Sequence, residues 1–267
     1  MSLFFRFRNT AISLQMLFSI FLGCFMLIYP NLNSIKAAIN IKNDYSPLYL
    51  DLIYHSHAGG CFDLFAPFIA VLPTSVTLCD EINNGFSNTI LLRTSRKKYY
   101  LEHIVISGLA GGISLSFPTA LVSIFFVLVG QPFYPKNEIT NIEVLTSAFQ
   151  NTIFGHIQSW RGGIGVLIIL TIFSFLFGAI WSTISLCIGA ISQKRFLAIS
   201  APFAIYFLLF LLCYRIPSLL IISPVNLLMP DLSTIPSVQF VFIYLGVFYM
   251  SIVVLCFYSL KRGLSNV

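Results

Sequence analysis

Long apolar runs separated by short polar segments dominate the chain. A membrane-spanning helix needs about 20 mostly apolar residues, because each residue adds about 1.5 Å along the axis and the hydrocarbon core is about 30 Å thick. The sequence therefore predicts six spans, at residues 11–29, 61–79, 104–129, 163–191, 196–214 and 238–260. Pro67 and Pro73 are expected to kink the second span, because proline lacks the N–H that the helical ladder needs.

The segment between the fifth and sixth spans, residues 216–236, reads IPSLLIISPVNLLMPDLSTIP. It is too short and too rich in proline to cross a bilayer, yet too apolar for a solvated loop. This pattern predicts a re-entrant or interfacial half-helix whose backbone is satisfied by protein or water. The whole pattern predicts an all-α integral membrane protein with a single domain over residues 1–267, since no repeat or linker divides the chain.

The composition agrees with a membrane protein, since 57% of the residues are hydrophobic and only 9% are charged. Soluble proteins have about 25% charged residues. The net charge of +6 does not indicate a nucleic-acid partner, because the basic residues lie between the apolar runs, where they set topology. The six cysteines contain no C-x-x-C spacing, so we interpret them as small apolar residues and expect no metal site.

The distribution of basic residues predicts the topology, because Lys and Arg concentrate in cytoplasmic loops. On one side the ends and short loops hold ten of them: Arg6, Arg8, Arg93, Arg96, Lys97, Lys98, Lys194, Arg195, Lys261 and Arg262. The opposite side holds Lys36, Lys42, Lys136, Arg161 and Arg215 in longer loops that also contain acidic residues. Both termini are therefore expected in the cytoplasm, with the chain crossing the plasma membrane, that is, the cytoplasmic membrane of a bacterium.

Charge is concentrated between the second and third spans, in the stretch CDEINNGFSNTILLRTSRKKYYLEH at residues 79–103. The enrichment of Lys and Arg in cytoplasmic loops accounts for the basic cluster of this stretch but not for its other residues. Gly85 can break the helix that precedes it, and Phe86 and Ile90 then lie on one side of a short helical turn. Ser95 can cap the next helix. An apolar helical face held at the cytosolic surface predicts a docking element, because such a face binds in the groove of a partner.

Ionisable residues near the spans are few, and we expect them to lie at the membrane interfaces. There a long side chain can extend its charged end into water, so the charge costs little free energy. They are Asp63, Glu102, Arg161 and Arg215. No span carries a carboxylate at mid-bilayer, which argues against a proton-coupled pump. His55 and His57 have no acidic or cysteine partner at ligand spacing. The sequence contains neither a phosphate-binding loop nor the residue sets of intramembrane proteases, so we expect no catalytic residue and no enzyme.

Small residues recur in the third span, where Gly108 and Gly112 stand four apart within SGLAGGIS. Such spacing lets helix backbones approach closely in a membrane. The seam that it predicts is either an interface with a second subunit or ordinary packing within the chain.

The stretch between spans two and three resembles that of permease subunits of ATP-binding-cassette (ABC) transporters of the type-2 exporter class. Glu81-x-x-x-Gly85, a leucine at 91 or 92, and Arg93-Thr94-Ser95-Arg96-x-x-Tyr99 are similar to the family's E-x-x-x-G…L-x-R-x-S-R-x-x-Y pattern. The resemblance covers nearly the whole chain, since the six spans, the cytoplasmic termini and the broken segment before the last span also fit. The family often has a lysine where span three opens, whereas this chain has Glu102 and His103.

The resemblance implies that the stretch is a coupling helix bound in a cleft of a separate cytosolic ATPase subunit. The residues implied are Asp80, Glu81, Gly85, Phe86, Ile90, Leu91, Arg93, Ser95, Arg96 and Tyr99. It also implies that the chain pairs with a second permease subunit, identical or related, and holds no cofactor itself, since the ATPase binds ATP and magnesium. The expected function is outward transport of an amphipathic or hydrophobic cargo such as a peptide, an antibiotic or a lipid-like molecule.

Two other classes of function stay open. A secondary transporter or channel without an ATPase would use mid-membrane charge or discontinuous helices. A membrane immunity or sensor protein would bind its ligand at residues 31–60 and 216–236 and would not need the docking element.

Overall fold

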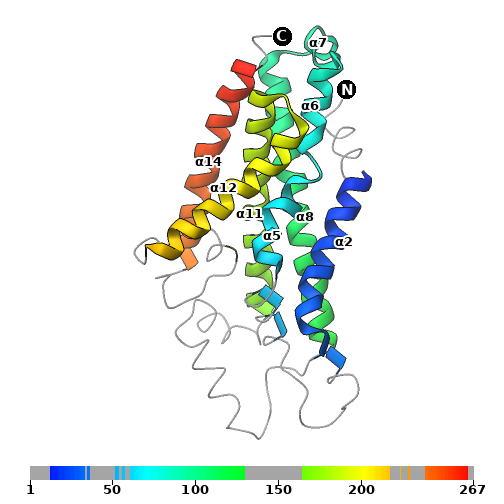
Figure 1. The fold of residues 1–267 in the computed structure, drawn as a ribbon, viewed down its shortest axis with the longest axis vertical. Coiled ribbons are helices and arrows are strands. Elements are labelled where there is room, and N and C mark those ends of the chain that lie inside the picture. The colour runs from blue at the N-terminus through cyan, green and yellow to red at the C-terminus, as the bar shows by residue number, and fades with distance from the viewer. Residues whose placement is uncertain are drawn as a thin grey trace, which may run out of the picture.

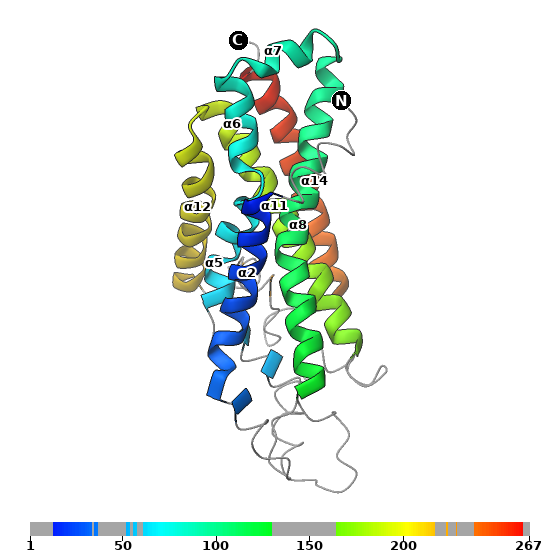
Figure 2. The same ribbon diagram turned by 90° about the vertical axis from the view of Figure 1, so that its right-hand side faces the viewer.

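Most of the long helices lie roughly along one long axis in a computed structural model (Figures 1 and 2). The structure describes residues 13–33, 35–36, 52–53, 56–57, 61–129, 164–216, 223, 228 and 238–263. Its regular elements are α2 (Leu14–Ile28), the 3-10 turn η1 (Tyr29–Asn31), α5 (Cys61–Val71), α6 (Ser75–Asn83), α7 (Phe86–Leu91), α8 (Arg96–Val129), α11 (Ile164–Ser192), α12 (Arg195–Arg215) and α14 (Val238–Gly263). Within these ranges no β-strand occurs.

Five of the helical stretches are long and apolar enough to cross a membrane. They are Leu14–Asn31, Arg96–Val129, Leu167–Ser192, Arg195–Arg215 and Phe240–Lys261. Large apolar side chains stand out from them, including Phe21, Leu128 and Tyr258, which are 70%, 79% and 67% exposed. Soluble proteins rarely expose large apolar patches, so these faces are suited to lipid. The helices and their apolar faces therefore confirm the prediction of an all-helical, multi-pass membrane protein.

The second predicted span, residues 61–79, is two helices rather than one kinked helix. α5 ends at Val71 and α6 begins at Ser75, and the turn between them contains Pro73. A proline inside a helix removes one hydrogen bond and its ring clashes with the carbonyl four residues earlier, so the ladder is interrupted here. Pro67 lies within α5, which continues through it. Both side views place α6 beyond the end of α5 along the long axis (Figures 1 and 2).

The third predicted span begins earlier than its apolar run indicated. α8 starts at Arg96 instead of residue 104, because Tyr99 and Tyr100 bury their side chains and carry the helix past the end of the apolar run. Ser95 directly precedes α8, and its carbonyl accepts a hydrogen bond from the Tyr99 N–H at 3.1 Å. The ends of α11, α12 and α14 lie within a few residues of the predicted ones.

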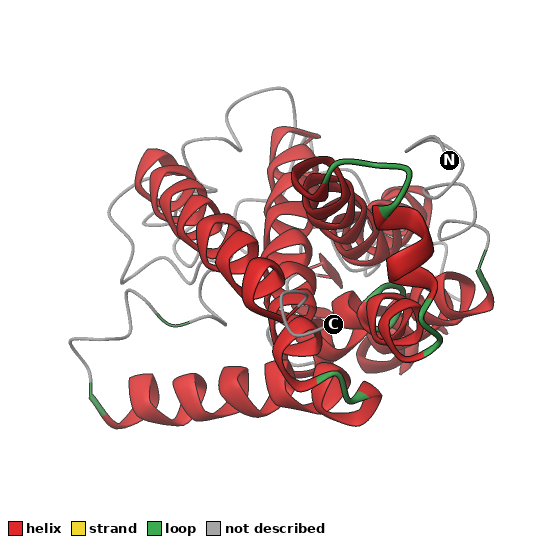
Figure 3. Ribbon diagram, turned by 90° about the horizontal axis from the view of Figure 1, so that it is seen from above, coloured by secondary structure: helices red, strands yellow, loops and turns green. Residues whose placement is uncertain are grey.

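The pair formed by α8 and α11 is the centre of the bundle. Figure 1 places α2 and α14 on opposite sides of this pair, and α12 slants away from the long axis, as the view from above also shows (Figure 3). One apolar core joins α2, α5, α8, α11, α12 and α14. A second, smaller core lies under α7 and contains Ile82, Tyr99, Tyr100, Leu186 and Leu260 among others.

The re-entrant segment predicted at residues 216–236 lies outside the described residues, apart from Ile216, Ser223 and Leu228. Most of the predicted outer loop at residues 31–60 lies outside them as well.

Candidate functional site

The short helix α7 lies across one end of the bundle, between α6 and α8 (Figures 1 and 2). α6 closes with two backbone hydrogen bonds of 3.0 Å, from the Asn84 N–H to the Asp80 carbonyl and from the Gly85 N–H to the Ile82 carbonyl. Gly85 then takes a φ of 67°, and α7 begins at the next residue, Phe86. The helix break predicted at Gly85 occurs there because only glycine adopts this left-handed conformation without steric strain.

A polar contact between α6 and α8 supports the turn that leads to α7. The Tyr99 hydroxyl donates to Glu81 Oε2 at 2.8 Å, and His103 Nε2 lies 3.1 Å from the same oxygen. The Tyr99 and His103 rings meet edge to face, with centroids 4.6 Å apart. Glu81 therefore connects the last turn of α6, which precedes α7 in the chain, to the first turns of α8, which follows it.

The turn between α11 and α12 also contacts α6. Gln193 has a φ of 54°, a left-handed conformation, and its carbonyl accepts a hydrogen bond from Asn83 Nδ2 at 3.3 Å. Arg195 forms an ion pair with Asp80. The sequence does not predict these contacts. It explains Arg195 by the topology alone, and no local pattern indicates that Gln193 adopts a left-handed backbone conformation.

The outward side of the α7 end combines apolar and basic side chains. Phe86 is 50% exposed and Leu92 is 88% exposed, whereas Ile90 packs against the smaller core. The exposed basic residues beside them are Arg93, Arg96, Lys97 and Lys98. None of these four forms an ion pair with another residue that the structure describes. We call Phe86, Leu92 and these four basic residues the α7 surface. It has the chemistry of a contact for an acidic groove with an apolar floor.

The glycines predicted to form a seam face other helices of the same chain. A Cβ added to Gly108 would lie 2.7 Å from the Tyr249 hydroxyl of α14, and one added to Gly112 would lie 2.6 Å from the Phe175 ring of α11. The closest approach is at their neighbour Gly111, because a Cβ on Gly178 would lie 2.2 Å from the Gly111 carbonyl oxygen. These small residues bring the backbones of α8 and α11 into direct contact.

A cluster of hydroxyls lies beside the break between α5 and α6. Thr74 Oγ1 lies 2.9 Å from Ser182 Oγ and 3.3 Å from Ser107 Oγ. Ser107 Oγ donates to the Ser182 carbonyl at 3.0 Å, and Ser182 Oγ donates to the Ser107 carbonyl at 2.7 Å. The hydroxyls are thus satisfied by one another and by the backbone carbonyls of Ser107 and Ser182, as polar groups shielded from water must be.

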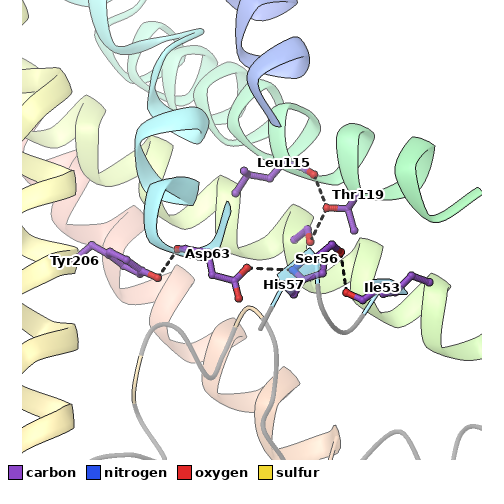
Figure 4. A network of polar contacts seen from close by, with 8 residues as sticks. Ile53, Ser56, His57, Asp63, Leu115, Thr119 and Tyr206 are labelled. Atoms are coloured by element: carbon purple, nitrogen blue, oxygen red, sulfur yellow. Dashed lines mark hydrogen bonds and ion pairs between the residues drawn. The ribbon is translucent and has the colours of Figure 1, made fainter. Parts of the chain in front are cut away.

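Asp63, in the first turn of α5, is buried among protein side chains. Its carboxylate Oδ1 lies 3.1 Å from His57 Nδ1, and the two side chains are 8% and 2% exposed (Figure 4). His57, for which the spacing along the sequence indicated no acidic partner, therefore has one. Glu102 is buried as well, at 7% exposure, whereas Arg215 is exposed. His55 and Arg161 lie outside the described residues.

The residues that the structure describes contain no group of three or more His, Cys, Asp or Glu side chains arranged to hold a metal ion. Comparison of the chain with protein-family models, with curated proteins and with solved structures finds no match.

Proposed function

We propose that the chain is the membrane-spanning permease subunit of an ABC exporter and that the α7 surface binds a cytosolic ATPase. The observation that carries the proposal is the position of α7: a short helix held across the end of the bundle, with an exposed aromatic side chain and four cations beside it. Such a helix fits the helix-in-groove mode of recognition, in which a few apolar anchors enter a partner groove.

The supports of α7 suit the transmission of movement. Glu81 joins α6 to α8, and the Asp80–Arg195 ion pair joins α6 to α12. Through these contacts, a displacement of α7 would move the ends of α6, α8 and α12 together. Phe86 would enter the partner groove, Arg93 would face acidic side chains at its rim, and Gly85 would allow the turn.

The proposal includes the finer architecture expected from the sequence. α5 and α6 together would form an interrupted second span, so that six spans place both termini and α7 in the cytoplasm of a bacterial cell. ATP and magnesium would bind only in the ATPase. Its closure would shift the conformational population of a permease dimer, homo- or heteromeric, toward an outward-open state. The cargo would be amphipathic or hydrophobic, as a peptide, an antibiotic or a lipid-like molecule is.

One observation favours a second candidate, a secondary transporter that works without an ATPase. The break at Leu72–Thr74 lies against the hydroxyls of Ser107 and Ser182, and discontinuous helices beside polar groups line substrate and ion sites in such transporters. A membrane immunity or sensor protein is the third candidate, with residues 31–60 and 216–236 as its ligand-binding loops.

The test is co-purification of the chain from native membranes in mild detergent, with identification of associated proteins and an assay of ATP hydrolysis. Three forms are compared: the native chain, Phe86→Asp and Asn84→Asp. Asn84 is exposed in the same turn, so Asn84→Asp adds the same charge without changing an apolar anchor. We expect a cytosolic ATPase to co-purify with the native chain and with Asn84→Asp, and to be reduced at least about tenfold by Phe86→Asp, since buried aromatic anchors dominate such interfaces.

Two results would count against the proposal. If no ATPase co-purifies with the native chain, the secondary transporter and the sensor become the better candidates. If an ATPase co-purifies equally with all three forms, it binds the chain elsewhere. The basic residues of the α7 surface then only set the orientation of the chain in the membrane.

A further inference from the structure

The turn between α11 and α12 carries two adjacent cations on a well-fixed backbone. Lys194 immediately precedes α12, Arg195 begins it, and both are exposed. The Lys194 N–H donates to Ser192 Oγ at 3.4 Å. One turn into α12, the Ala198 carbonyl accepts a hydrogen bond from Ser185 Oγ of α11 at 2.6 Å. These contacts, together with those that α6 makes to the turn, hold the two cations side by side.

Exposed apolar side chains flank these cations on both sides along the chain. Ile191 in the last turn of α11 is 65% exposed, and Phe196 and Leu197 in the first turn of α12 are 78% and 40% exposed. A long cationic side chain beside apolar ones is typical of residues at the boundary between lipid and water. We call Ile191, Lys194, Arg195, Phe196 and Leu197 the α12 turn surface.

The position of this turn along the bundle differs from that of α7. Both side views show the turn set back along the long axis, while α7 lies farther out (Figures 1 and 2). The α12 stretch Arg195–Arg215 is long and apolar enough to cross a membrane. The end of such a helix lies at the level of the lipid headgroups. The α12 turn surface is therefore placed to contact phospholipid, whereas α7 is placed beyond it.

The two cations differ in how they are paired. Arg195 forms the ion pair with Asp80, but its side chain is 59% exposed and its guanidinium has five N–H donors, so a second acceptor can reach it. Among the residues that the structure describes, Lys194 forms no ion pair. A phosphate group suits this arrangement, because guanidinium and ammonium groups both bind its oxygens with charge-assisted hydrogen bonds.

We propose that the α12 turn surface binds a phospholipid with an anionic headgroup, in the leaflet at the α7 end of the bundle. Lys194 and Arg195 bind the phosphate, and Ile191 and Phe196 contact the acyl chains. The phosphate competes with Asp80 for Arg195, so a bound lipid weakens the connection between α6 and α12. A zwitterionic headgroup fits less well, because its ammonium group would lie near the two cations. The inference goes beyond the proposed function, since it needs neither the α7 surface nor an ATPase.

The test is native mass spectrometry of the purified chain in detergent, titrated with phosphatidylglycerol or with phosphatidylcholine. We expect the native chain to bind the first phosphatidylglycerol at least about fivefold more tightly than the first phosphatidylcholine. The double variant Lys194→Gln, Arg195→Gln should lose this preference, with phosphatidylglycerol binding weakened at least about tenfold, because each cation near an anionic lipid contributes roughly fivefold. Lys97→Gln, Lys98→Gln is the control: it removes two adjacent exposed cations at the same end of the bundle and should change the binding less than about twofold.

A second variant should strengthen the binding. Asp80→Asn removes the competitor for Arg195, so phosphatidylglycerol should bind about twofold to fivefold more tightly, the range expected from loss of a partly solvated ion pair. Glu81→Gln is its control, because it removes the same charge at the next position, where the carboxylate contacts Tyr99 and His103 instead. A gain in binding cannot result from misfolding, so this variant tests the proposal even if the double variant fails to fold.

Three results would overturn the proposal. The first is equal binding of the two lipids by the native chain, and the second is an equal loss in the double variant and its control. The third is displacement of the lipid by glycerol phosphate at the same concentration, which would mean that the cations bind a free phosphate rather than a lipid. If Asp80→Asn gains no more than Glu81→Gln, Arg195 is not shared between Asp80 and the phosphate, and the competition is wrong. Circular dichroism and gel filtration check the fold of each variant.

Discussion

The seam between α8 and α11 and the end of the bundle around α7 differ in how closely their elements are packed. In the seam, glycine lets one backbone touch the other: a Cβ on Gly178 would lie 2.2 Å from the Gly111 carbonyl oxygen. At the α7 end the smaller apolar core is supplemented by contacts between polar side chains, and in the Asp80–Arg195 ion pair these are 35% and 59% exposed. Direct backbone packing leaves no room to adjust, whereas partly solvated side chains can change partners at little cost.

This difference indicates which part of the molecule can move. The α8–α11 pair is expected to behave as one rigid body, while α7 and the turn before α12 can shift relative to it. Elements that respond to partners belong to the less stable parts of a protein. The proposed permease would need both properties, and the predictions below test them separately.

The largest effect is expected in the seam, from Gly178→Val. The new side chain would meet the backbone of Gly111, which cannot rotate away, so the free energy of unfolding should fall by more than about 3 kcal/mol, above the usual range for overpacking. The measurement is unfolding of the purified chain by a denaturing detergent, followed by circular dichroism. Gly246→Val in α14 is the control, because a Cβ there meets nothing within 4 Å, and it should change the stability by less than about 1 kcal/mol. Equal losses in both variants would show that the α8–α11 contact is not the tight one.

Much of this seam could be predicted from the sequence, because it depends on composition and periodicity. Apolar run length located the long helices, and the small residues of SGLAGGIS indicated close packing. The break before α6 follows from Pro73, although a kink was expected there. The early start of α8 could not be predicted from hydropathy, because Tyr99 and Tyr100 are buried by packing that the run itself does not reveal.

The polar contacts were less predictable, because neither a repeat nor a helical period in the sequence connects the residues that they join. Gly85 could be identified as a helix breaker from its type alone, and its φ of 67° agrees. The ion pair of Arg195 with Asp80 depends on where α12 begins in space. His57 and Asp63 stand six positions apart, a spacing that no helical or strand period relates. A lone carboxylate in an apolar run was the only signal that the sequence offered for this contact.

A smaller effect is expected at the turn into α7, from Gly85→Ala. No atom lies within 4 Å of a Cβ at this position, so the loss arises from the positive φ alone and should be about 1 kcal/mol. Gly85→Asn should lose less, because asparagine tolerates the left-handed conformation better than other residues with a side chain. Detergent unfolding of the three forms measures their stability, which should decrease in the order Gly, Asn, Ala. If alanine and asparagine were equally harmful, packing or partner contacts rather than backbone conformation would explain the glycine.

The smallest effect is expected from the ion pair between α6 and α12. Because both side chains are partly solvated, Asp80→Asn and Arg195→Gln should each lower the stability by less than about 1 kcal/mol, and the double variant should reveal a coupling of about 0.2–1 kcal/mol that shrinks in high salt. The measurement is a double-mutant cycle by detergent unfolding at low and high ionic strength. A coupling above about 2 kcal/mol that salt does not change would mean that the pair is shielded from water, as buried pairs are. The α7 end would then be as rigid as the seam, and the movement attributed to it would have to arise within the bundle, where the helix break at Pro73 is the remaining interruption between α6 and α5.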